Sequence, residues 1–147
     1  MSDMEVVLRA WLLDSSPSGQ WLHYHIGNAF RGETDSLLHA DGRYALWSTV
    51  TSGRQRREFT GRCDPDDVRA IAELMVRQEL WRAKHVAGHQ AEDDSEASLE
   101  VGDDGRHDRV VLWMSEIRSV PRFERVQEAL LCLARRLSGS EILEIGR

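Results

Sequence analysis

Lysine, cysteine and long apolar runs are scarce in this sequence, and the scarcity of lysine leaves the positive charge almost wholly on arginine. Lys84 is the single lysine among 19 basic residues, against 25 acidic residues and a formal net charge of −6. An acidic protein has little general affinity for nucleic-acid backbones or anionic membranes. No apolar run approaches the roughly 18 residues of a membrane-spanning helix, and the first residues do not resemble a signal peptide. We therefore expect a cytoplasmic protein without membrane contact.

Paired cysteines and the best-known catalytic motifs are also missing. Cys63 and Cys132 lie far apart and form no CxxC pair, so neither a zinc ribbon nor a thioredoxin-like motif is expected, while a single disulfide stays open. The sequence lacks the motifs of the most recognisable nucleotide-binding and hydrolase families. It contains no GxGxxG after a strand, no P-loop, no HExxH and no GxSxG. We assign no catalytic residue, metal or cofactor and favour a non-enzymatic role, although an enzyme with scattered residues fits the same absences.

What the sequence does contain is the composition of one folded domain. Its 147 residues are 41% hydrophobic and 30% charged, enough to bury one core, so residues 1–147 are expected to form a single globular domain. Apolar residues predict a first strand over residues 5–13 and a second over residues 20–26, followed by a loop over residues 27–34.

Two hairpins follow in the prediction. Residues 35–40 and 43–51 flank Asp41-Gly42, which favours a type I′ turn because both central residues would take positive φ, and residues 55–60 read as a further strand. Residues 85–97 lack periodicity and read as a loop. Residues 98–101 and 109–114 flank a turn with two glycines and predict the second hairpin, and residues 141–145 read as a short edge strand.

Two amphipathic helices carry the clearest start signals. Asp64 followed by Pro65 predicts a helix that ends near Trp81, and Pro121 begins a second helix that Gly139 ends. The expected fold is therefore α+β: a mainly antiparallel sheet of about five to seven strands with two amphipathic helices packed on one face.

Histidines and acidic residues suggest metal sites, but simpler interpretations are favoured. His23 and His25 share one side of a strand, and His85 and His89 would share one face of a helix, although Gly88 argues against that helix. The acidic run at residues 92–96 with Asp103 and Asp104 lacks the spacing of a calcium loop. Solvated or hydrogen-bonded side chains explain both sets.

The arginines near residue 55 and the cysteines are weaker candidates still. Arg54, Arg56 and Arg57 lie near aromatic residues, a combination found in single-strand nucleic-acid binders, but the net acidity makes nucleic acid an unlikely ligand. Cys132 lies away from the helix N-terminus where a reactive thiol is favoured, and Cys63 precedes one; an inert thiol is the simpler interpretation for both.

The most informative pattern is the alternation of tryptophan with aliphatic residues in the expected strands. Because successive strand side chains point to opposite faces, one face collects leucine, valine and tyrosine and suits the helices. The other collects residues typical of binding hot spots. The predicted binding residues are Trp11, Trp21, His23, His25, Arg43, Trp47, Arg109 and Trp113.

We expect these residues to form the surface of a non-catalytic protein-binding module, an adaptor or an immunity-type inhibitor, which uses this face or the acidic loop. The partner is a protein, including a second copy of the chain as a homodimer. The alternative function is a small-molecule-binding protein or an enzyme, with a pocket lined by Trp21, His23, His25 and Trp47. The competing structural interpretation is that loops cover the face, so that its tryptophans form a second small core.

Overall fold

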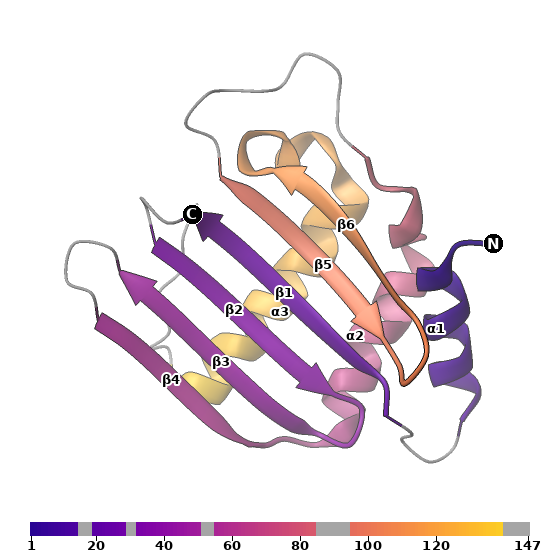
Figure 1. The fold of residues 1–147 in the computed structure, drawn as a ribbon, viewed down its shortest axis with the longest axis horizontal. Helices are drawn as coiled ribbons and strands as arrows, with labels where there is room; N and C mark the ends of the chain where they lie inside the picture. The colour runs from indigo at the N-terminus through magenta and orange to yellow at the C-terminus, as the bar shows by residue number, and fades with distance from the viewer. Residues whose placement is uncertain (15–18, 29–31, 51–54, 85–94, 140–147) are drawn as a thin grey trace.

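The computed structural model describes residues 1–14, 19–28, 32–50, 55–84 and 95–139. Its six strands form one sheet in the order β4-β3-β2-β1-β5-β6, and every neighbouring pair is antiparallel. The described helices lie behind this sheet (Figure 1). The elements are α1 (Asp3–Leu13), β1 (Trp21–Asn28), β2 (Gly32–His39), β3 (Arg43–Val50), β4 (Gln55–Arg62), α2 (Pro65–Arg77), η1 (Leu80–Arg82), β5 (Glu96–Gly102), β6 (His107–Trp113), η2 (Met114–Ser119) and α3 (Pro121–Ser138). The predicted α+β fold is confirmed.

The first element differs from the prediction, because residues 5–13 belong to helix α1 and not to a strand. Its buried residues are Met4, Val7, Leu8 and Trp11, a spacing of three or four that puts them on one helical face. The hydroxyl of Ser2 accepts a hydrogen bond from the backbone N–H of Glu5 at 3.1 Å and caps the helix. Within the described residues, three α-helices, and not two, therefore cover the sheet.

The two predicted helices are present, with one shifted end. Asp64 caps α2 by accepting a hydrogen bond from the N–H of Asp66 at 2.9 Å. This helix ends at Arg77 and not near Trp81, because Glu79 adopts a left-handed conformation with φ of 48° before η1 begins. Helix α3 ends at Gly139, which has a φ of 64°, as the C-terminal glycine predicts.

The predictions at the two ends of β2 need correction. Gly42 has a φ of 97°, while Glu79 is the described non-glycine residue with positive φ. Asp41 therefore does not, and the β2–β3 turn is not type I′. Of the predicted loop over residues 27–34, the described residues belong to strands, because β1 continues to Asn28 and β2 begins at Gly32. Residues 29–31 lie outside the described part of the chain.

Parts of several other predictions lie outside the described residues. These parts are residues 85–94 of the predicted loop, with His85, Gly88, His89 and most of the acidic run at residues 92–96, together with residue 51, Arg54 and the strand over residues 141–145. Strand β5 already begins at Glu96. Asp103 has a structural role, since its Oδ1 accepts hydrogen bonds from the N–H groups of Gly105 and Arg106 at 2.9 and 2.8 Å.

The core fills the space between the sheet and the helices. Tyr24 is 1% exposed at its centre, and its hydroxyl accepts a hydrogen bond from Nε2 of Gln127 on α3 at 2.9 Å. None of the described helices is long and apolar enough to cross a membrane. The core side chains come from sheet and helices alike, among them Met4, Leu8, Leu22, Leu38, Leu46, Met75, Leu99, Leu112, Phe123 and Leu130.

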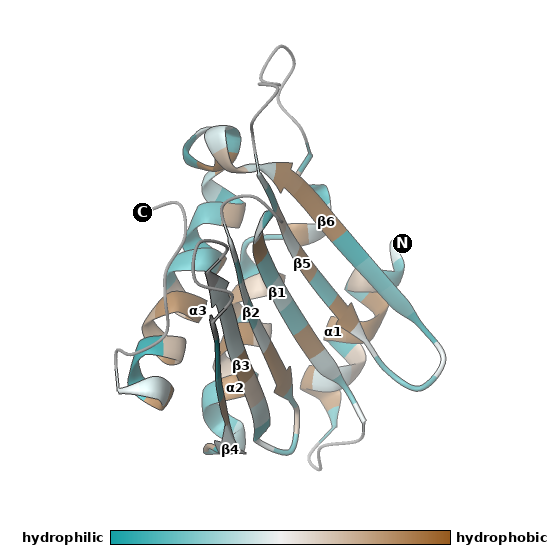
Figure 2. Ribbon diagram, turned by 60° about the vertical axis from the view of Figure 1, so that its left-hand side comes forward, coloured by the Kyte–Doolittle hydropathy of each residue, from teal (hydrophilic) through white to brown (hydrophobic). Residues whose placement is uncertain are grey.

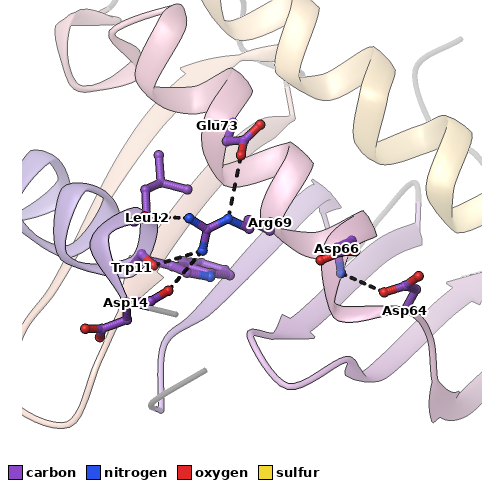
Figure 3. Close-up of polar contacts among 7 residues, drawn as sticks. All are labelled: Trp11, Leu12, Asp14, Asp64, Asp66, Arg69 and Glu73. Atoms are coloured by element: carbon purple, nitrogen blue, oxygen red, sulfur yellow. Dashed lines mark hydrogen bonds and ion pairs between the residues drawn. The ribbon is translucent and has the colours of Figure 1, made fainter. Parts of the chain in front are cut away.

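Arg69 joins α1 to α2 (Figure 3). Its guanidinium donates to the carbonyls of Trp11, Leu12 and Asp14 at the end of α1. The last carbonyls of a helix have no partner within the helix, so the side chain supplies one from outside. Glu73 lies 3.6 Å from Nε of Arg69 on its other side.

Candidate functional site: the open face of the sheet

The sheet has one face under the helices and one on which no described helix lies, which we call the open face (Figure 2). Alternation along each strand assigns the side chains, because Leu22, Tyr24 and Ile26 are buried in the core while the residues between them are half-buried. The open face includes Trp21, His23, His25, Glu33, Asp35, Leu37, His39, Arg43, Ala45, Trp47, Thr49, Arg56, Glu58, Thr60, Arg62, Glu96, Ser98, Glu100, His107, Arg109, Val111 and Trp113.

At its centre, two histidines from β1 share one carboxylate from β2. Oδ1 of Asp35 lies 2.8 Å from Nε2 of His23 and 2.9 Å from Nδ1 of His25. Asp35 lies opposite His25 in the β1–β2 register, and His23 lies two residues before His25 on the same face of β1. The Asp35 side chain is 6% exposed, against 29% and 27% for the two histidines. The carboxylate is therefore enclosed while both rings reach the surface.

These contacts change the protonation of the cluster. Burial by itself raises the pKa of Asp35, but the hydrogen bonds from His23 and His25 outweigh burial and hold this pKa below its ordinary value. The hydrogen bond to Asp35 raises the pKa of His25 against the opposing effect of burial, and the charges of Asp35, Glu33 and Glu96 add to the rise. The cluster favours an ionised carboxylate beside a readily protonated imidazole.

Trp47 continues the cluster toward the edge of the sheet. The indole stacks on the His23 ring with centroids 5.8 Å apart and an interplanar angle of 28°. The guanidinium of Arg56 lies 5.6 Å from the centroid of the indole, within the range of a cation–π contact. The three side chains therefore form a continuous arrangement from β1 to the edge strand β4.

The other predicted binding residues fall into different surroundings. The indole of Trp21 lies against Gly102, its partner on β5, since a Cβ added to Gly102 would be 2.3 Å from Cζ2 of Trp21. Trp113 is half-buried and Arg109 exposed on β6. Arg43, at the start of β3, donates from Nε to Asp41 at 2.8 Å.

Trp11 is not part of this face. It lies on α1 and is 3% exposed in the core, because the segment expected to be a strand is a helix. Its prediction as a surface residue followed from that assignment and is wrong.

Charge is distributed unevenly across the open face. Strands β1, β2 and β5 contain no arginine or lysine, and they place Glu33, Asp35, Glu96 and Glu100 on the open face. The arginines of this face are on β3, β4 and β6. An acidic centre is therefore bordered by arginine.

Asp35 is the residue that sequence reasoning missed. The β1–β2 register pairs His25 with Asp35, but residues 27–34 read as a loop, which left the register between the two strands undefined. Two histidines in alternation, followed by an aspartate of the same parity in the next strand, are the signal that continuous strands would have provided.

Other candidates do not form sites with the open face. In the part of the chain that the structure describes, no group of three or more His, Cys, Asp or Glu residues is arranged to hold a metal ion. Two cavities of about 370 and 390 Å³ are lined by helix-side residues such as Met114 and Gln127, or Ile71 and Cys132. Cys63 and Cys132 are free, and burial raises the pKa of the Cys63 thiol, with Asp67 adding to the rise.

The fold and this face define an α+β protein with a one-sided helical layer and a histidine-bearing sheet surface. The chain matches no protein-family model and no curated protein sequence.

Proposed function

We propose that this protein is a non-catalytic protein-binding module, an adaptor or an immunity-type inhibitor, that docks a cytoplasmic partner on its open face. The observation that carries the proposal is the one-sided helical layer, which leaves Trp47 and Trp113 half-buried on a sheet surface. Tryptophan and arginine are the residue types that contribute most to protein interfaces.

Shape supports a protein partner over a small ligand. Small-molecule sites are usually concave cavities that enclose most of the ligand, whereas the two described cavities are lined by residues on the helical side. The open face presents a broad sheet surface on which aromatic side chains alternate with charged ones, and aromatic residues and arginine are enriched at protein interfaces.

Affinity capture from the native host, compared between variants, tests this proposal. Wild-type protein, Trp47→Ala, Trp113→Ala and the helix-side variant Arg125→Ala serve as baits, and the exposed Arg125 provides the matched control. We expect one protein to be captured by wild type and Arg125→Ala and lost with both tryptophan variants. Equal capture by all four baits contradicts docking on this face.

A second function rests on the histidine cluster. A histidine oriented by a carboxylate is the arrangement of many general bases, and Asp35 orients both His23 and His25. An enzyme or small-molecule-binding protein would use this cluster on the same face. Thermal melting in the presence of each compound of a metabolite library tests this second function. A compound that raises the melting temperature of wild type and not of His25→Gln would favour it.

A further inference from the structure

We infer that the partner of the open face is a basic protein segment, whose arginine and lysine side chains lie against the carboxylates of β2 and β5, the two strands that flank β1. This inference rests on the proposed function and adds the chemistry of the partner. It is carried by the pairing of carboxylates with indoles on this face and by the absence of arginine and lysine from its central strands β1, β2 and β5.

Charge complementarity is the first argument. The open face has Glu33 and Asp35 on β2 and Glu96 and Glu100 on β5. Neither these two strands nor β1 between them contains arginine or lysine. Glu96 is exposed, and the Glu100 side chain is 26% exposed. Matched potentials steer encounter and fix the register of an interface. A cationic segment matches the centre of the face, while an anionic one is repelled there.

Each of the two outer tryptophans has a carboxylate as its direct cross-strand neighbour. Asp35 lies opposite Trp47, where its enclosed carboxylate contributes negative charge without direct contact to a partner. The exposed Glu96 lies opposite Trp113 and is the carboxylate that a partner can reach. A guanidinium pairs with a carboxylate and also stacks on an indole, so the two residue types together suit arginine better than either does alone. The Arg56 guanidinium over Trp47 is an example within the chain.

The same charges disfavour a second copy of the chain as the occupant. A two-fold interface places the same patch of both subunits around the axis. Face-to-face packing would bring the acidic centre of one copy onto that of the other, between chains that each have a net charge of −6. A different, basic protein relieves this repulsion.

His25 makes the interaction sensitive to pH. The groups facing it are Asp35 and Glu33 on β2, Glu96 on β5 and His23 on β1. Protonation of its imidazole adds positive charge in the middle of these carboxylates. Acidification through the titration of His25 should therefore weaken the binding of a cationic segment, while an apolar contact would keep its strength.

Amide NMR titration of the full chain with two synthetic dodecapeptides tests the inference. One peptide alternates arginine with glycine and the other alternates glutamate with glycine. We expect the arginine peptide to shift amides of β1, β2 and β5 at about pH 8, with about tenfold weaker binding at about pH 5.5. The glutamate peptide should shift none of them.

Two double variants with equal charge change separate the face from net charge. Glu96→Gln with Glu100→Gln acts on the open face, and Glu73→Gln with Glu128→Gln acts on the helices. We expect the first pair to weaken the arginine peptide about tenfold, since each exposed charge pair contributes a modest amount, and the second pair to leave it nearly unchanged.

The outcomes distinguish the inference from the proposed function. Equal weakening by both pairs, or shifts spread over the helices, means attraction by net charge alone and overturns the inference. No binding of the arginine peptide, while Trp47→Ala still loses the captured host protein, overturns the basic partner and keeps the binding face. A dimer that dissociates in Trp47→Ala assigns the face to a second copy and also overturns the inference.

Discussion

Asp35 is the residue whose surroundings do most to define the open face. Its carboxylate is enclosed by the sheet while it accepts hydrogen bonds from His23 and His25. A buried charge is costly unless hydrogen bonds and opposite charge compensate for it. The two imidazoles provide both, so the cluster couples the stability of the sheet to pH.

The first prediction concerns that coupling. Because the pKa of His25 is raised in the folded protein, His25 contributes to the free energy of unfolding at low pH. This contribution is lost as the pH rises through that pKa. Because the pKa of Asp35 is lowered in the folded protein, Asp35 contributes to the free energy of unfolding at any pH above its pKa in the unfolded chain. This contribution is lost when the pH falls through the lower, folded pKa. The cluster therefore stabilises the protein most at about pH 4 to 6.5.

Urea unfolding at about pH 6 and about pH 8.5 measures this effect in wild type and Asp35→Asn. We expect wild type to lose the contribution of His25 at the higher pH. Asp35→Asn should be less stable by about 1.5–3 kcal/mol at pH 6 and should show a smaller difference between the two pH values. The same pH dependence in both proteins would assign it to other groups.

The second prediction concerns Gly102, whose missing side chain leaves room for the Trp21 indole. A methyl group there would be 2.3 Å from Cζ2 and 2.6 Å from Cε2 of Trp21, so the rigid ring would have to leave β5. We expect Gly102→Ala to lower the free energy of unfolding by about 1–3 kcal/mol. Gly105, with nothing within 4 Å of an added Cβ, is the matched control.

Urea unfolding followed by tryptophan fluorescence compares the two alanine variants. Gly105→Ala should stay within about 0.5 kcal/mol of wild type. If both variants are equally stable, the indole of Trp21 moves away without cost and does not stabilise the β1–β5 pair.

At the scale of single residues, the alternation of side chains along each strand was the informative part of the sequence. It grouped Trp21, His23, His25 and Trp47 by strand parity, and the structure places all four on one face. It missed Asp35 because the shared carboxylate depends on the register between β1 and β2, and residues 27–34 between the predicted strands read as a loop. Contacts across strands are not encoded in the local pattern of either strand.

At the scale of the elements, the end of α1 is held by another helix. Arg69 of α2 donates to carbonyls of Trp11, Leu12 and Asp14, which α1 itself leaves without partners. The third prediction is that Arg69→Met, which keeps most of the aliphatic stem, destabilises the protein by about 1–2 kcal/mol. Arg77→Met, an exposed change on the same helix, should cost under about 0.5 kcal/mol.

Hydrogen exchange locates this effect within the molecule. Amides in the last turn of α1 should exchange faster in Arg69→Met and remain as in wild type in Arg77→Met. Arg69→Lys should restore part of the protection, because an ammonium can reach fewer carbonyls than a guanidinium. Unchanged exchange in Arg69→Met would show that water replaces the guanidinium without loss.

The elements themselves were predicted unequally. The start of α2 and both ends of α3 were predicted correctly, because Asp64, Pro65, Pro121 and Gly139 act through local backbone geometry. The end of α2, which has no such signal, was placed too far along the chain. Helix α1 was assigned to a strand because its many apolar residues obscured the helical spacing of Met4, Val7, Leu8 and Trp11. Its burial on the sheet is a tertiary property, and tertiary contacts override weak local preference.

At the scale of the whole molecule, the strand order explains both the correct class and the open face. Strand β1 pairs with β2 on one side and with the distant β5 on the other, so the second hairpin completes the sheet next to the first strand. All the described helices then pack on the aliphatic face (Figure 1). The α+β class followed from the pattern of elements, whereas the central place of β1 depends on long-range pairing that the sequence pattern does not specify.

The last prediction follows from that one-sided architecture and concerns the oligomeric state. An acidic centre on the open face and a net charge of −6 oppose face-to-face self-association, and this repulsion is strongest when salt does not screen it. We expect light scattering to give a monomer at about 0.02 M salt. Added salt should favour any dimer that uses this face. The double variant Glu96→Gln with Glu100→Gln should also favour such a dimer, whereas the helix-side double variant Glu73→Gln with Glu128→Gln should leave the monomer unchanged. A low-salt dimer that Trp47→Ala dissociates would contradict the prediction, because apolar contact would then outweigh the repulsion between the two acidic centres.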